Sequence, residues 1–101
     1  MEKTEFARRL VSLRMDKNVS AREMSLALGQ SPGYINNIEN GANYPSMAIF
    51  FYICEYLDVT PEEFFASDNA HPAKARALAE AAQHLSAEQL ERLTAIAREL
   101  K

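Results

Sequence analysis

The sequence predicts an all-α fold, in which five helices form one domain and a helical hairpin follows it. Apolar residues recur at intervals of three and four along most of the chain, which is the spacing of one helix face. Serine, threonine and proline residues stand at the beginnings of these apolar runs, where helices are usually capped. No segment shows the pattern of a strand that would pair with another. The composition, 48% hydrophobic and 25% charged residues, is that of an ordinary globular domain.

Two helices are predicted before residue 30. The first spans residues 4–17, and Thr4 is expected to cap it. The second begins at Ser20, which can form a capping box with Glu23, and it ends at Gly29. The apolar positions of the two helices are Phe6, Leu10, Leu13, Met24, Leu26 and Leu28.

A third, short helix is predicted over residues 31–40. Ser31 followed by Pro32 is a strong signal for a helix start, and Asn40 followed by Gly41 is a signal for its end. Its apolar positions are Tyr34, Ile35 and Ile38. The rest of this segment is polar but almost uncharged, which indicates that it presents side chains to a partner.

The fourth and fifth helices follow closely. Residues 47–57 contain many β-forming residues, but their apolar residues fall at helical intervals, so we expect a helix. Its predicted core positions are Met47, Phe50, Ile53, Cys54 and Leu57. Thr60, Pro61 and Glu63 then form the start signal of a short helix that ends at Phe65.

The chain is predicted to divide into three parts. Residues 1–65 hold the five helices, residues 66–72 are small and polar and predict a linker, and residues 73–101 predict a helical hairpin. The last helix of the hairpin carries apolar residues along one side. These residues are Leu90, Leu93, Ile96 and Leu100.

Several classes of protein are not expected from this sequence. Cys54 is the only cysteine, so it predicts no disulfide within the chain, and it is interpreted as buried filler. No residues have metal-ligand spacing, and no catalytic carboxylate pair or phosphate-binding loop is present, so we expect neither an enzyme nor a cofactor. No apolar run reaches the length of a membrane span and the N-terminus does not read as a signal peptide, which predicts a cytoplasmic protein.

The second and third predicted helices form a helix-turn-helix arrangement, in which the second helix can enter the major groove of DNA. Individual residues also match the motif of a known family, above all the string I-x-x-I-E-N-G-x-x-x-P-S from Ile35 to Ser46. The others are Leu13, Arg14, Val19, Ser20, Met24, Leu28, Gly29, Ser31, Leu57, Val59, Glu63, Phe64 and Phe65. With these residues the chain resembles the Cro/CI (XRE-type) family of phage-repressor-like helix-turn-helix regulators.

The resemblance implies a lambda-repressor-like DNA-binding domain whose recognition helix is the segment 31–40. It places five residues toward the bases: Ser31, Pro32, Gly33, Asn36 and Asn37. Direct readout then depends mainly on the two asparagines, because their amides can pair with adenine. Candidate contacts to the DNA backbone are Arg8, Arg9, Lys17, Arg22, Tyr34 and Asn40. The resemblance also implies that Arg14 and Glu39 form a structural ion pair that orients the recognition helix.

The fourth predicted helix carries more apolar surface than one core face needs. Either the C-terminal hairpin folding back or a second subunit can cover the surplus. We favour a homodimer, because operators of the family are usually paired half-sites. The predicted interface consists of Ile49, Tyr52, Tyr56, Leu90, Leu93, Ile96 and Leu100.

Charge argues against strong DNA binding by one subunit. The chain has a net charge of −3, and residues 1–65 hold six lysines and arginines against nine aspartates and glutamates. We therefore expect a repressor that acts as a homodimer on paired half-sites. The alternative is a protein-interaction module that has the same fold but has lost strong DNA binding.

Overall fold

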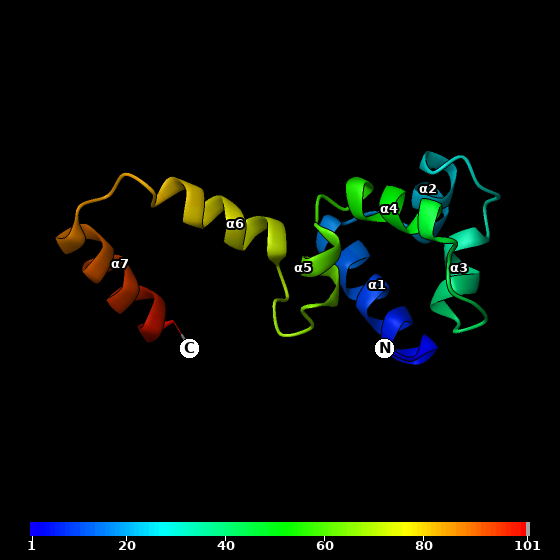
Figure 1. The fold of residues 1–101 in the computed structure, drawn as a ribbon, viewed down its shortest axis with the longest axis horizontal. Helices are drawn as coiled ribbons and strands as arrows, with labels where there is room; N and C mark the ends of the chain where they lie inside the picture. Colours follow the sequence, from blue (N-terminus) through cyan, green and yellow to red (C-terminus); the bar gives the residue numbers. More distant parts are fainter. Residues whose placement is uncertain (101) are drawn as a thin grey trace.

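The computed structural model describes residues 1–100, and every regular element within this range is a helix. The elements are α1 (Lys3–Lys17), α2 (Ala21–Ala27), α3 (Tyr34–Glu39), α4 (Met47–Tyr56), α5 (Pro61–Phe65), α6 (Pro72–Ala81) and α7 (Ala87–Glu99). The predicted all-α class is confirmed. The molecule measures 51 × 23 × 22 Å. Figure 1 shows α1 to α5 gathered at one end of the long axis, while α6 and α7 extend toward the other end.

One apolar core joins the first five helices. Its centre contains three phenylalanine rings from α1, α4 and α5: the centroid of Phe6 lies 5.9 Å from that of Phe50 and 4.9 Å from that of Phe64. The buried core residues are Phe6, Leu10, Leu13, Met24, Ile35, Ile38, Phe50, Ile53, Cys54, Leu57, Val59 and Phe64. Most of the predicted helix faces therefore meet in this core.

Two predicted apolar positions lie outside the core. Met47 is 64% exposed, because helix side chains lean toward the N-terminus and this residue stands in the first turn of α4. Its side chain therefore leans past the end of the helix. Leu26 is 51% exposed, because it follows Met24 by two residues and so faces the opposite side of α2.

Four of the helices, α2, α4, α5 and α7, begin at the side-chain caps that the sequence predicts or allows. Thr60 and Ser86 each form both bonds of a capping box, and Ser20 accepts a hydrogen bond from the Glu23 amide. The prediction for Thr4 is wrong. Helix α1 begins one residue earlier, and the Phe6 amide donates to the carbonyl of Glu2 rather than to a side chain.

Tight turns connect the first five helices. After each of α1 to α4 one residue has a positive φ and the next amide bonds back to the last turn of the helix, which is the Schellman pattern. The residues with positive φ are Asn18, Gly29, Gly41 and Asp58. These turns keep the connections short, so the positions of neighbouring helices are closely determined.

The hairpin does not fold back over α4. Helix α6 leads away from the five-helix unit and α7 lies at the far end of the molecule (Figure 1). The two helices share an open apolar groove, and α7 contains no buried residue. The predicted end of the hairpin, residue 101, lies outside the described residues.

Candidate nucleic-acid interface

Helices α2 and α3 form a helix-turn-helix unit, but α3 begins later than the sequence predicts. The predicted start at Ser31 and Pro32 is wrong: Pro32 and Gly33 form a turn, and α3 begins at Tyr34. No side chain caps it from the preceding residue, since Gly33 occupies the N-cap position. The Tyr34 amide instead donates to the Ser31 carbonyl, at 3.1 Å, which closes the turn.

The start of α3 is held by a serine from the neighbouring helix, Ser25 of α2. Its side chain is fully buried; its hydroxyl donates to the Ala21 carbonyl at 2.7 Å and accepts from the Ile35 amide at 3.0 Å. Ser25 therefore satisfies one of the free amides of the first turn of α3, which is the role of a cap. Nothing in the sequence predictions pointed to Ser25, although a serine next to the apolar Met24 was a possible signal.

The two faces of α3 differ sharply. Ile35 and Ile38 are buried against α1 and α2, whereas Asn36, Asn37 and Asn40 are exposed on the other side. The amides of Asn36 and Asn37 form no side-chain hydrogen bond with any residue from 1 to 100. They are therefore available to an external partner.

An ion pair fixes α3 against α1. The Arg14 Nε and Nη2 atoms donate to the two carboxylate oxygens of Glu39 at 2.7 and 3.0 Å, and both side chains are largely buried. The predicted structural pair is therefore present. The hydrogen bond to Glu39 raises the pKa of the Arg14 guanidinium, so this group stays charged. Arg14 also donates to the Val19 carbonyl at 2.9 Å, which links the pair to the turn before α2.

The predicted backbone contacts do not all lie together. Arg8 and Asn40 line one groove between α1 and the end of α3, with a volume of about 360 Å³. Arg22 is exposed in the first turn of α2. Lys17, in contrast, places its ammonium group 5.2 Å from the ring centroid of Tyr56 on α4. The structure therefore groups Arg8 with α3 but holds Lys17 beside α4.

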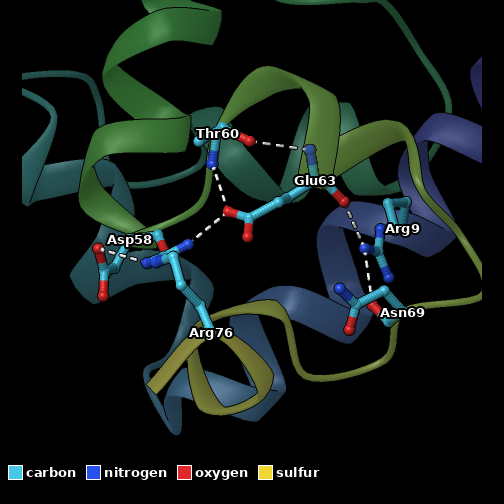
Figure 2. A network of polar contacts seen from close by, with 6 residues as sticks. All are labelled: Arg9, Asp58, Thr60, Glu63, Asn69 and Arg76. Atoms are coloured by element: carbon cyan, nitrogen blue, oxygen red, sulfur yellow. Dashed lines mark hydrogen bonds and ion pairs between the residues drawn. The ribbon is translucent and has the colours of Figure 1, made fainter. Parts of the chain in front are cut away.

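Arg9 is not available to DNA, and its prediction is corrected. The side chain is buried, and its guanidinium donates to the carbonyl of Phe64 at 2.6 Å. It also donates to the carbonyls of Glu63 and Asn69 at 2.7 and 2.9 Å (Figure 2). Burial lowers the pKa of this guanidinium. Arg9 faces α5 because its position on α1 lies beside Phe6 and Leu10, on the core side. It therefore has a structural role.

Tyr34 occupies an intermediate position. Its ring is half-buried and packs against the core, and burial raises the pKa of its hydroxyl group. The remaining predicted base-facing residues, Ser31, Pro32 and Gly33, are exposed in the turn before α3. The turn and the outer face of α3 thus form one exposed polar surface.

Residues 1–100 were also compared with the requirements of a metal site, a reactive thiol and a membrane span. No three metal-binding side chains come together within this range. Burial raises the pKa of the Cys54 thiol to about 11, which suppresses the reactive thiolate. None of the described helices is long and apolar enough to cross a membrane.

A comparison with protein families agrees with this geometry. A family model described as helix-turn-helix matches residues 10–64, which is more than half of the chain. The match includes α2, the turn, α3 and α4. No curated protein and no solved structure matches the chain.

Proposed function

Because the chain belongs to the Cro/CI-like (XRE) helix-turn-helix family and is a DNA-binding transcription regulator, we propose that it acts as a homodimeric repressor on paired half-sites. In this proposal residues 1–65 bind DNA and residues 73–101 take part in pairing with a second copy. Residues 66–72 connect these two parts. Repression follows from occupation of the operator, which excludes other proteins from the same DNA.

The main support for DNA binding through α3 is the exposure of the Asn36 and Asn37 amides. Both project from a helix whose opposite face is fixed by Ile35, Ile38 and the ion pair of Glu39. An asparagine amide can donate to N7 of adenine and accept from its N6 amino group only if the helix that carries it is held at a defined angle in the major groove. The contacts of Ile35, Ile38 and Glu39 supply that constraint. Ser31, Pro32 and Gly33 would then approach the bases from the preceding turn.

Contacts to the DNA backbone come from either end of the helix-turn-helix unit. Arg8 and Asn40 share the groove beside the end of α3, and Arg22 lies in the first turn of α2. Cations at these positions would meet phosphates on the two sides of the major groove. Tyr34 can add a hydrogen bond from its hydroxyl, whereas Lys17 requires a change of rotamer to leave Tyr56.

Uncovered apolar surface supports the homodimer. Helix α7 has no buried residue, and Leu90, Ile96 and Leu100 are 39%, 54% and 80% exposed. An amphipathic helix of this length is marginal without a partner for its apolar face. A second copy offers the same face, so pairing of the hairpins would bury both.

Helix α4 contributes to the uncovered surface, but of its three residues predicted for the interface only Tyr52 is exposed. Ile49 and Tyr56 are half-buried against the core of their own domain. The exposed apolar residues of α4 are Met47, Phe51 and Tyr52, and Phe65 of α5 is exposed as well. The proposed interface on this helix is therefore shifted toward Phe51.

The shape of the molecule restricts how two copies can bind adjacent half-sites. Helix α3 and the hairpin lie toward opposite ends of the 51 Å axis (Figure 1). An end-to-end pairing of hairpins would place the recognition helices too far apart. Two copies side by side, each 23 by 22 Å across, instead allow a separation of about 34 Å, the repeat of B-DNA.

Selection of bound fragments from random duplexes, followed by titration, tests the proposal. Asn36→Ala and Asn37→Ala should each weaken binding to the selected operator by about 1–3 kcal/mol and relax the preference at one base pair. Gln83→Ala, which removes an exposed amide from the hairpin end, is the matched control and should change nothing. Arg8→Gln should lower the slope of log affinity against log salt by about one. Equal binding by all these variants would refute the DNA contact assigned to α3.

The second candidate is a protein-interaction module, favoured by the net charge of −3 and the exposed aromatic residues Phe51 and Tyr52. This candidate predicts no salt-dependent binding to random duplex DNA, because salt-dependent binding comes from phosphate contacts that such a module lacks. It also predicts that Phe51→Ala, and not Asn36→Ala, abolishes the cellular activity. The two outcomes exclude each other.

A further inference from the structure

The first turn of α6 is fastened to the five-helix domain from several sides. The contacts come from α1, from α5 and from the turn between α4 and α5 (Figure 2). We refer to this cluster as the joint. Its residues are Arg9, Asp16, Asp58, Glu63, Asn69, His71, Pro72, Lys74 and Arg76.

Arg9 holds the connecting segment from within the domain. Two of its three acceptors, the carbonyls of Glu63 and Phe64, belong to the last turn of α5, and the third is the carbonyl of Asn69 in the segment before α6. A buried guanidinium must keep its donors satisfied, so moving the segment away would leave a buried charge with fewer partners. The segment is therefore bound to the domain and does not act as a free tether.

Arg76 fastens α6 to the other side of the same region. Its Nη1 atom lies 2.5 Å from Glu63 Oε1, and its Nη2 atom donates to the carbonyl and the carboxylate of Asp58 at 3.0 and 3.2 Å. Glu63 also accepts from the Thr60 amide at 2.9 Å, so one carboxylate joins the start of α5 to α6. Figure 2 shows these groups converging between α5 and α6.

Asp16 of α1 completes the joint. Its Oδ1 atom accepts from Lys74 Nζ at 2.6 Å and lies 2.6 Å from His71 Nδ1. Between these two residues Pro72, the first residue of α6, is fully buried. Polar contacts on three sides of a buried proline leave α6 little freedom to pivot.

Helix α1 connects the joint to the recognition helix. Arg9 and Asp16 belong to α1, and so does Arg14, which holds α3 through Glu39. A helix of 15 residues is stiff over its length. The direction of α6 is therefore fixed relative to α3, although the two helices lie far apart in the molecule.

We propose that the joint is a positioning device that sets which separation of paired half-sites the dimer binds. This inference rests on the proposed function, a dimer that pairs through its hairpins. With a rigid joint, pairing of the hairpins imposes one distance and one rotation on the two α3 helices. A flexible linker in the same place would let one dimer bind half-sites at several separations. Arg76 and Asp16 are then positioning residues that act on specificity without touching DNA.

The decisive variants are Arg76→Gln and the double variant Asp16→Asn with Arg76→Gln. Arg9 stays unchanged, because its removal from the buried site threatens the fold. The matched control is Arg92→Gln, which breaks the exposed pair of Arg92 with Glu88 on α7 and leaves the joint intact. If the double variant fails to fold, the single variant still removes both ion pairs of Arg76, with Asp58 and with Glu63, and supplies the same readout.

The first measurement tests the rigidity of the joint without DNA, and its result does not depend on dimerisation. Spin labels replace Ala42 in the turn after α3 and Gln83 beyond α6, in a chain with Cys54→Ala diluted into unlabelled protein. The unaltered joint should give one narrow distance distribution, and the control should give the same. The joint variants should broaden it. An equally narrow distribution in the joint variants would overturn the proposal.

The second measurement uses duplexes whose two half-sites are separated by steps of one base pair. The unaltered protein should prefer one separation over its neighbours on the order of 100-fold, the scale of avidity gained when geometry permits simultaneous binding. The joint variants should lose most of this preference, while their affinity for a single half-site and their dimer mass stay unchanged. An unchanged preference overturns the proposal. If the unaltered protein stays monomeric or binds no paired sites, the proposed function fails instead, and the distance measurement still shows whether the joint is rigid.

Discussion

Replacement of Ser25 by alanine tests how helix α3 is held in place. The hydroxyl of Ser25 is the partner of the Ile35 amide, at 3.0 Å, and both residues are fully buried. Alanine leaves that amide without an acceptor and without access to water. The bond to the Ala21 carbonyl is a smaller loss, because a carbonyl within a helix also accepts from the amide four residues later.

The expected magnitude follows from these contacts. A buried donor left without a partner costs about 1–3 kcal/mol, and loss of a helix cap costs about 0.5–2 kcal/mol. Both ranges describe the same bond here, so they are not added, and we expect a loss of about 2 kcal/mol. For a domain of this size that corresponds to a fall of about 8–16 °C in melting temperature. Helix α3 has only six residues, so its DNA affinity should fall as well.

Urea denaturation followed by circular dichroism measures the effect, and Ser31→Ala is the control. The hydroxyl of Ser31 is exposed and forms no hydrogen bond with any other described residue, so the control should stay within about 0.5 kcal/mol of the natural protein. A neutral Ser25→Ala together with a costly Ser31→Ala would refute the reasoning. That result would mean that α3 begins at the serine indicated by the sequence alone.

Three further predictions use the ionisable groups. A double-mutant cycle of Arg14→Ala and Glu39→Ala, measured by urea denaturation, should give a coupling energy of about 1.5–3 kcal/mol. The reason is that the ion pair is bidentate and largely buried, and additive effects of the two substitutions would contradict it. Lys74 lowers the pKa of Asp16, and the Thr60 amide lowers that of Glu63, so both groups stabilise the fold above their unfolded pKa values of about 4. That stability should disappear as the pH falls below about 4, and Asp16→Asn should flatten a profile of unfolding free energy against pH. With its pKa raised to about 11, the Cys54 thiol should react with a thiol reagent at pH 8 only as fast as the protein unfolds, and fast labelling of the folded protein would contradict its burial.

Local signals in the sequence were sufficient for most of the helices. The capping box of Thr60 and Glu63 fixes the start of α5 through groups that lie three residues apart. The helical spacing of Phe50, Ile53 and Leu57 outweighed the β-forming composition of α4. Signals of this kind are readable because their partners are neighbours in the chain. The pair of Arg14 and Glu39 is distant in sequence, and only the family resemblance indicated it.

Contacts between distant segments account for what was missed. Ser25 caps α3 from another helix, so the local signal of Ser31 and Pro32 pointed to the wrong residue. Arg9 has the composition of a phosphate contact, yet three carbonyls from α5 and the following segment surround it. Likewise nothing in the polar segment 66–72 indicates that it is bound to the domain. These roles depend on which helices pack together, and periodicity within a helix does not contain that information.

The distribution of charge explains how an acidic chain can bind DNA. Three of the acidic residues meet cations of the hairpin at the root of α6: Asp16 pairs with Lys74, and Asp58 and Glu63 pair with Arg76. Another, Glu39, is neutralised by Arg14. Arg8 and Arg22 form no ion pair with any residue from 1 to 100 and remain available beside the helix-turn-helix unit. Because interactions between exposed charges fade over about 10 Å, the potential at α3 depends on these nearby arginines more than on the net charge of −3. In the proposed dimer the hairpin therefore assists DNA binding in two ways: it positions the second copy, and its cations neutralise acidic groups of the domain that would otherwise repel phosphate.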